Sequence, residues 1–143
     1  MTAGAGAQGE RPLSGGDYRA LARFRHALRV FLHFSEDAAR SAGMTPAQHQ
    51  LLLAVKGWSG DSTPTISGLA EVLRLRPHSA AELVHRAAAA GLLQTSSDPD
   101  DHRRQLCTLT PHGEELLSSL SLQHRDELRR FRTLMNDVLS ELG

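Results

Sequence analysis

The sequence has few of the residues that build redox centres or membrane spans. Of its 143 residues one is cysteine and 4% are aromatic. A lone cysteine, Cys107, excludes an internal disulfide and a zinc site built on several cysteines. No apolar run approaches the roughly 20 residues that cross a bilayer, and the N-terminus lacks the basic and apolar segments of a secretion signal. We therefore expect a cytoplasmic protein that does not enter a membrane.

Short motifs of the common enzyme classes are also missing. The sequence contains no H-E-x-x-H, no G-x-S-x-G, no P-loop and no nucleotide-binding glycine fingerprint. Asp100 and Asp101 are adjacent in a predicted turn, so their side chains should diverge rather than form a general acid–base pair. His26 and His33 share a helical face, but no third metal ligand accompanies them. We expect neither an enzyme nor a cofactor or metal site.

An excess of charge of one sign is absent, because 16 basic residues balance 16 acidic ones. Phosphate contacts supply most non-specific affinity for DNA, so this chain has no general basic field to attract it. Lys56 is the only lysine, and the other bases are arginines. Arginine suits bidentate contacts with phosphate and guanine. Any contact with nucleic acid must therefore depend on local geometry.

Two short predicted helices lie at the centre of the chain, at residues 66–73 and from Pro77 onwards. The first has apolar residues at steps of three and four: Ile66, Leu69, Ala70 and Leu73. The inner face of the second has the same spacing: Ala80, Leu83, Val84 and Ala87. Two short helices joined by three or four residues form a helix-turn-helix, although turns join short helices in any helical protein.

A predicted β-hairpin follows these helices. Gly91 is a natural C-terminal stop for the second helix. The stretch 96–104 is rich in turn formers, and residues 105–109 alternate between polar and apolar, which is typical of a strand. The predicted fold is therefore mainly α with a small β-hairpin wing, a winged helix-turn-helix.

Another helix start precedes this region. Thr45-Pro46-Ala47-Gln48 combines an N-cap threonine, proline at the first helical position and glutamine as the capping-box partner. The predicted helix runs to about Gly57 and buries three apolar residues: Leu51, Leu52 and Val55. Trp58 should fill the bend that follows, and Thr65 or Ser67 should cap the next helix.

Two long helices are predicted at the ends of the chain, at 17–42 and 111–143. Asp17 is the predicted N-cap of the first, and a bend at 123–125 is predicted to divide the second into two. A small domain has too little core to cover both apolar helices, so we expect them to pair with a second copy. The predicted dimer contacts are Leu21, Phe24, Leu28, Leu128, Phe131, Leu134 and Val138. Residues 1–16 are Gly-, Ala- and Ser-rich and are predicted to be a flexible tail.

Several of these segments together resemble the MarR family of bacterial transcription regulators, over about residues 17–143. The matching segments are Thr45–Gln48, Ile66–Leu73, Ala90–Leu93, Asp98–Arg103 and Leu109–Gly113. The resemblance implies a homodimer that binds double-stranded DNA at a roughly palindromic operator, most often as a repressor. It assigns 17–42 and 111–143 to dimerisation and 45–109 to the DNA-binding lobe. It also implies a small lipophilic or phenolic effector bound between these parts.

The resemblance also assigns roles to individual residues. The second helix of the pair would enter the major groove, where Glu82 can accept a hydrogen bond from the amino group of cytosine. Arg76 and Arg86 would reach phosphates, and Arg103, braced by Asp101, would enter the minor groove. The predicted DNA-binding residues are Arg74, Arg76, Pro77, His78, Ser79, Glu82 and Arg86 in the helix and turn, and Asp101, His102, Arg103 and Arg104 in the wing.

Two positions depart from the family pattern. Arg74 stands where glycine is common in the turn, and Arg76 stands where a serine or threonine cap is common. A missing cap typically costs about 1 kcal/mol. The zero net charge and Glu82 also favour an alternative function, a dimeric winged-helix adaptor that has lost DNA binding. Cys107, on a predicted wing strand, is expected to be a buried and inert thiol.

Overall fold

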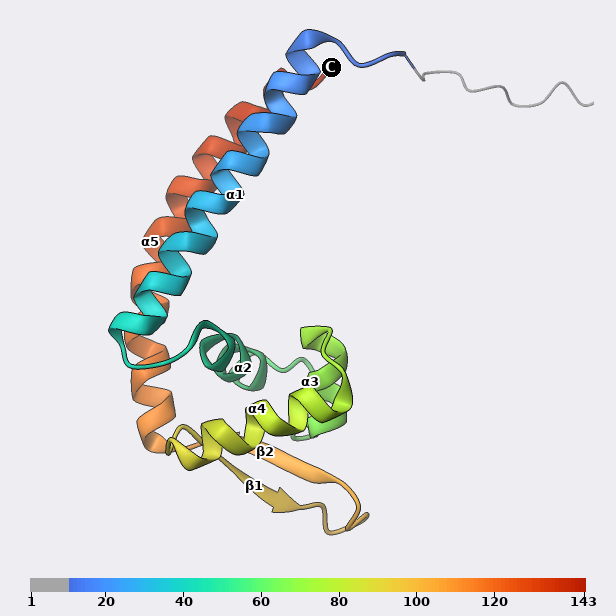
Figure 1. The fold of residues 1–143 in the computed structure, drawn as a ribbon, viewed down its shortest axis with the longest axis vertical. Helices are drawn as coiled ribbons and strands as arrows, with labels where there is room; N and C mark the ends of the chain where they lie inside the picture. Colours follow the sequence, from blue (N-terminus) through green and yellow to red (C-terminus); the bar gives the residue numbers. More distant parts are fainter. Residues whose placement is uncertain (1–10) are drawn as a thin grey trace, which may run out of the picture. The chain divides into compact units, whose positions relative to one another are not determined.

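The computed structural model describes residues 11–143, so most of the predicted tail lies outside the described residues. The chain divides into two compact units, residues 11–32 with 127–143 and residues 33–126. Its elements are, in order, α1 (Gly15–Ser41), α2 (Pro46–Lys56), α3 (Ile66–Leu73), α4 (Pro77–Ala89), β1 (Leu93–Ser97), β2 (Gln105–Leu109) and α5 (Pro111–Glu141) (Figure 1). The predicted fold class, mainly helical with one antiparallel hairpin, is confirmed. No helix between residues 11 and 143 has the length and apolarity that a bilayer span requires.

The first unit is an antiparallel pair of helices made by the N-terminal part of α1 and the C-terminal part of α5 (Figure 1). The rings of Phe31 and Phe131 have centroids 5.5 Å apart, and Arg23 forms an ion pair with Glu141. Val138, predicted as a dimer contact, is only 2% exposed within this single chain. The prediction that Val138 contacts a partner is therefore wrong, because this side chain is buried within the helix pair and has little surface left for a second copy.

The first turn of α1 is fixed by Ser14, not by Asp17 as predicted. The Ser14 backbone N–H donates to Asp17 Oδ2 at 3.0 Å, and the Asp17 N–H donates to Ser14 Oγ at 3.1 Å. This reciprocal pair is a capping box, so the helix begins two residues earlier than expected, at Gly15. The hydrogen bond from the Ser14 backbone, followed by one from Gly143, lowers the pKa of Asp17.

The second unit contains the main apolar core. At the start of α2, the predicted capping box of Thr45 and Gln48 is present in both directions. Thr65, not Ser67, caps α3 by accepting from the Gly68 N–H at 3.0 Å. Trp58 packs against the core and approaches Gly68 so closely that a Cβ there would lie 2.8 Å from its ring. The core residues contributed by α2 are those predicted: Leu51, Leu52 and Val55.

The bend predicted at 123–125 is wrong, because α5 is one helix of 31 residues. The polar residues there have partners that keep the helix intact. His124 Nδ1 lies 2.7 Å from the Leu120 carbonyl oxygen, and its Nε2 lies 2.7 Å from Ser35 Oγ on α1. The His49 ring on α2 lies 4.8 Å from the His124 ring, centroid to centroid. Burial, followed by the charge of the neighbouring His124, lowers the pKa of His49, so the folded chain favours its neutral form.

The turn between α3 and α4 is unusual at both positions that depart from the family pattern. Arg74 adopts a left-handed conformation with φ 55° and ψ 43°, and it is the one residue other than glycine with positive φ in the described chain. Arg76 occupies the N-cap of α4 without a side-chain capping hydrogen bond. Pro77 follows at the first helical position, where its fixed φ suits a helix start.

Replacing Arg74 with glycine is expected to raise the free energy of unfolding by about 0.5–1 kcal/mol. An L-residue loses about 1–2 kcal/mol in the left-handed region, and the greater backbone entropy of glycine offsets part of the gain. Arg74→Ala is the control, because it removes the charge and keeps the steric cost. Urea denaturation of the three proteins gives the comparison. Equal stability of the glycine and alanine variants would contradict the prediction.

Candidate nucleic-acid interface

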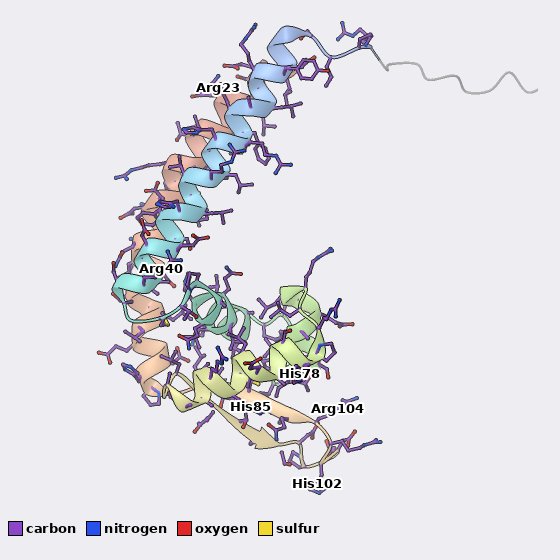
Figure 2. All side chains as sticks on the ribbon, in the orientation of Figure 1. Arg23, Arg40, His78, His85, His102 and Arg104 are labelled. Atoms are coloured by element: carbon purple, nitrogen blue, oxygen red, sulfur yellow. The ribbon has the colours of Figure 1, made fainter. Side chains whose placement is uncertain are left out.

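The outer face of α4 is polar and exposed. His78, Ser79, Glu82, His85 and Arg86 are all exposed, and Figure 2 labels His78 and His85 on this helix. The opposite face is buried and holds α4 against α2 and α3. Its fully buried residues are Ala80, Val84 and Ala87. The packing of one face therefore fixes which side chains the other face presents.

One ion pair links two successive turns of this outer face. Arg86 Nη2 lies 2.6 Å from Glu82 Oε1. Both side chains remain largely exposed, at 73% and 52%. An exposed pair four residues apart on a helix contributes only about 0.3–0.5 kcal/mol, so its main effect is on the direction of the two side chains and not on the stability of the fold.

Two hollows lie beside this ion pair. The larger has a volume of about 400 Å³ and the smaller about 180 Å³. Glu82 and Arg86 line both hollows, so the ion pair stands between them. Two small residues, Ala81 and Ala89, also line the larger hollow, and neither is among the predicted DNA-binding residues. The sequence does contain a signal for these two alanines. Ala81, His85 and Ala89 recur every four residues, so they form a row on the helix next to the row of His78, Glu82 and Arg86.

The wing is a hairpin of β1 and β2, whose register pairs Leu93 with Leu109 and Ser97 with Gln105. Backbone hydrogen bonds close its turn, from the Asp98 N–H to the Arg104 carbonyl at 3.0 Å and from the Arg104 N–H to the Asp101 carbonyl at 2.9 Å. Figure 2 labels His102 and Arg104 in this turn. The four predicted wing residues thus belong to one tight turn beyond the strands.

Asp101 holds two arginines of this turn. Its Oδ1 lies 3.1 Å from Arg103 Nε, and its Oδ2 lies 3.7 Å from Arg104 Nε. The hydrogen bond from the Arg103 side chain, followed by the one from its backbone, lowers the pKa of Asp101, which favours the anion. The Arg103 side chain is nevertheless 91% exposed. Its guanidinium is oriented by Asp101 through Nε and Nη2, and the side chain remains open to an anionic partner.

The wing is attached to the loop before α3. The Cys107 N–H donates to the Pro64 carbonyl at 2.9 Å, and Thr65 forms a β-bridge with Leu106. Cys107 is fully buried, as predicted, and burial raises the pKa of its thiol to about 11. The wing and α3 are therefore parts of one packed body.

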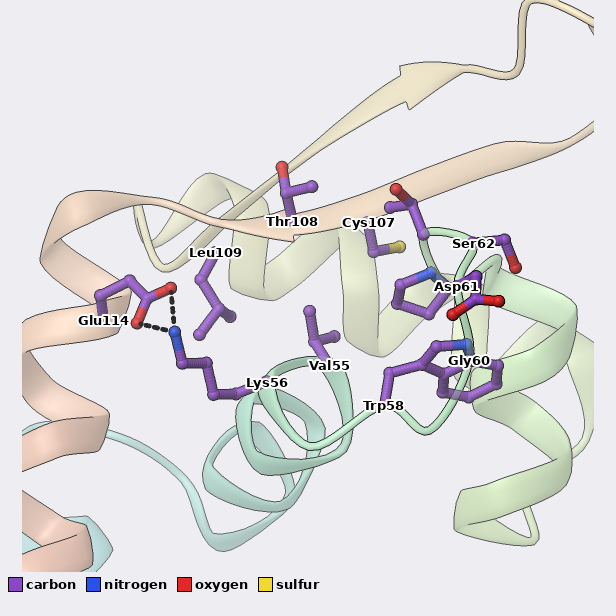
Figure 3. A pocket seen from close by; sticks show the side chains of 12 residues that line it. Val55, Lys56, Trp58, Gly60, Asp61, Ser62, Cys107, Thr108, Leu109 and Glu114 are labelled. Atoms are coloured by element: carbon purple, nitrogen blue, oxygen red, sulfur yellow. Dashed lines mark hydrogen bonds and ion pairs between the residues drawn. The ribbon is translucent and has the colours of Figure 1, made fainter.

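A pocket of about 340 Å³ lies between the end of α2, the following loop, β2 and the start of α5 (Figure 3). An ion pair between Lys56 and Glu114, 3.0 Å long, lies at one end, and Trp58 and Asp61 lie at the other. Its lining mixes charged, hydroxyl and apolar groups. None of the predicted DNA-binding residues lines it.

The remaining predicted dimer residues all lie in the two-helix unit. Leu21 and Leu128 are 43% and 49% exposed. The other four are partly buried: Phe24, Leu28, Phe131 and Leu134. Apart from Val138, each therefore keeps some surface in the single chain.

Comparison with known proteins agrees with this architecture. A model of the MarR family matches residues 42–104, whereas no curated protein matches the chain. AbsC, a MarR family transcriptional regulator from Streptomyces coelicolor, is 21% identical, with a TM-score of 0.69 over 85% of this chain and 81% of its own. A mutant of S. aureus MepR bound to an oligodeoxyribonucleotide is 19% identical, with a TM-score of 0.62 over 88% and 84%.

A third solved structure bears on regulation. Bordetella bronchiseptica BpsR, whose DNA binding is regulated by 6-hydroxynicotinic acid, is 20% identical, with a TM-score of 0.62 over 85% of this chain and 84% of its own. These likenesses concern the fold, and the match of the family model covers the winged-helix segment. Residues 42–104 are therefore similar to the MarR family, and the fold is that of solved MarR family structures.

Proposed function

We propose that this chain is a cytoplasmic transcription repressor, which binds a pseudo-palindromic duplex operator as a homodimer. The observation that carries the proposal is that one packed unit presents both an exposed polar helix face and an exposed arginine, Arg103, whose guanidinium is held by Asp101. Neither feature has a part in the apolar core. Both have the chemistry that duplex DNA requires, namely donors for phosphate and for base edges.

Each surface suits a different groove. A single helix fits the major groove, where its first residues meet base edges, and α4 begins with exposed His78 and Ser79. An extended arginine fits the narrow minor groove, whose negative potential attracts it, and Arg103 is the most exposed of the ion-paired wing residues. Arg74 and Arg76 precede α4 and supply positive charge for the flanking phosphates.

The two-helix unit supports a dimer. Two helices alone cannot cover all of their apolar residues, and seven large ones in this unit remain exposed: Leu13, Tyr18, Leu21, Val30, Leu32, Leu128 and Leu139. A second copy supplies a matching apolar surface, because a twofold interface is self-complementary. A twofold dimer presents two α4 helices to two half-sites, which requires an inverted repeat.

We further propose release of the operator by a small lipophilic or phenolic effector. The support is the family resemblance together with BpsR, whose DNA binding responds to 6-hydroxynicotinic acid. An effector that binds the DNA-free state more tightly shifts the population towards that state. MepR, solved with an oligodeoxyribonucleotide, supports the DNA partner in the same way.

The proposal is tested by selecting, from random duplex DNA in moderate salt, the sequences that the protein binds. The full chain is expected to enrich an inverted repeat with half-site centres about one helical turn apart. Arg103→Ala should weaken binding to the selected duplex about tenfold and should reduce the salt slope by about one. Arg130→Ala is the matched control, because Arg130 is also an exposed arginine held by an acid, Glu127, at 3.1 Å, and lies in the two-helix unit.

Failure of the selection has a defined meaning. No enrichment, with weak binding that is equal for all duplexes even at low salt, would overturn the DNA-binding proposal. It would favour the dimeric adaptor that the zero net charge also suits. Equal loss in the Arg103 and Arg130 variants would overturn the role of the wing.

A further inference from the structure

We infer that the Glu82–Arg86 pair acts as one unit that recognises a G·C base pair in each half-site. The inference rests on the proposed function and adds which bases the recognition helix prefers. It also changes the expected role of Arg86, which moves from a phosphate to a base edge. The carrying observation is the 2.6 Å contact between Arg86 Nη2 and Glu82 Oε1 on the exposed face of α4.

The pair has the hydrogen-bond pattern that complements G·C. In the major groove, guanine offers two acceptors, N7 and O6, and cytosine offers one donor, its N4 amino group. Guanine O6 and cytosine N4 are hydrogen-bonded to each other, so they are about 2.9 Å apart. Arg86 Nη2 and Glu82 Oε1 have almost the same separation. A donor can therefore face O6 while an acceptor faces N4.

The positions on the helix allow this approach. Side chains on a helix lean towards its N-terminus, so Arg86 extends back over the turn that holds Glu82. A guanidinium has five N–H donors, and the contact through Nη2 leaves donors for N7 and O6. The pair also stands between two hollows. Because of these hollows, the neighbouring side chains do not block the pair from reaching a base pair.

Electrostatics favours a base edge for Glu82 over a phosphate. A carboxylate facing the DNA backbone is repelled, and its partner Arg86 reduces that repulsion without removing it. The amino group of cytosine is a donor, and Glu82 Oε1 can accept a hydrogen bond from it while it remains paired with Arg86. An A·T pair instead places an acceptor, thymine O4, near this position, so the carboxylate disfavours it.

Selection with a matched set of variants tests the inference. The full chain should select G·C at one symmetric position in each half-site. Glu82→Gln should lower the preference for G·C at that position about tenfold or more, since glutamine pairs with adenine, and should leave the other positions unchanged. Arg86→Ala should relax the same position. Glu127→Gln is the control, because Glu127 makes a comparable ion pair with Arg130 on α5, and it should change no position.

The outcomes separate this inference from the proposed function. If the full chain selects an inverted repeat and Glu82→Gln leaves every position unchanged, the base-pair inference is overturned and the regulator proposal stands. If Arg86→Ala weakens all sequences equally, Arg86 binds a phosphate and the inference is again overturned. If the full chain selects nothing, the proposed function itself fails. A shift confined to one symmetric position in both variants supports the inference.

Discussion

Gly113→Ala is expected to destabilise the winged-helix unit by about 3 kcal/mol or more. A Cβ added at Gly113, in the first turn of α5, would lie 1.9 Å from the Leu92 carbonyl oxygen and 2.9 Å from its carbon. That carbonyl cannot move alone, because it accepts from the Thr110 N–H at 3.2 Å. Thr110 Oγ1 also donates to the Gly91 carbonyl at 2.5 Å. Overpacking against fixed backbone costs more than overpacking against a side chain.

Gly15→Ala is the matched control for this prediction. Gly15 is also in the first turn of a long helix, and a Cβ there meets only Arg19 Nη1, at 3.6 Å. Alanine at this place should raise stability by up to about 1 kcal/mol. Urea denaturation followed by circular dichroism measures both variants. An unfolding midpoint of Gly113→Ala close to that of the parent chain would show that α5 does not pack against Leu92 as closely as described.

Leu128→Asp is expected to convert the dimer to a monomer and to weaken operator binding at least about 100-fold. Leu128 is 49% exposed on α5 in the two-helix unit, so the single chain should tolerate aspartate there. At a twofold interface the change removes apolar area and places two unpaired carboxylates in it, at a large desolvation cost. A monomer binds one half-site only. It loses the high effective concentration with which the second subunit of a dimer binds the second half-site.

Leu53→Asp provides the comparison, because Leu53 is 51% exposed but lies on α2 in the other unit. It should remain dimeric and bind the operator like the parent chain. Sedimentation gives the oligomeric state, circular dichroism gives the fold, and titration of the selected duplex gives affinity. A dimeric Leu128→Asp protein with full affinity would contradict the proposed interface. Loss of helix content would instead show that Leu128 serves the single chain.

Local signals predicted the elements of the winged-helix unit well. Thr45 with Gln48 gave the start of α2, the apolar spacing gave the bounds of α3, and Gly91, with φ 75°, ended α4. In each case the residues that decide the structure lie within one helical turn of the place they control. The departure at Arg74 was also visible in the sequence, because the family resemblance places glycine at this position of the turn.

The errors arose where the deciding partner is distant in sequence. The predicted bend of α5 failed because His124 finds Ser35 and His49 on other helices. Val138 was predicted for the dimer because spacing identifies an apolar face but not which neighbour covers it. The ion pairing of Glu82 with Arg86 has a visible i,i+4 signal. The two hollows beside it depend on side-chain packing that no local pattern specifies.

Because Cys107 is buried, its reaction with a thiol reagent can report when the wing separates from the rest of the winged-helix unit. It is the single cysteine in the sequence, it is fully buried, and its thiol has a pKa of about 11. Because thiol reagents attack the thiolate, labelling in the folded state requires β2 to separate from the Pro64 carbonyl that holds it. The labelling rate at neutral pH therefore follows the frequency of that separation. A ligand or a duplex that holds the wing in place should slow it, with no engineered probe.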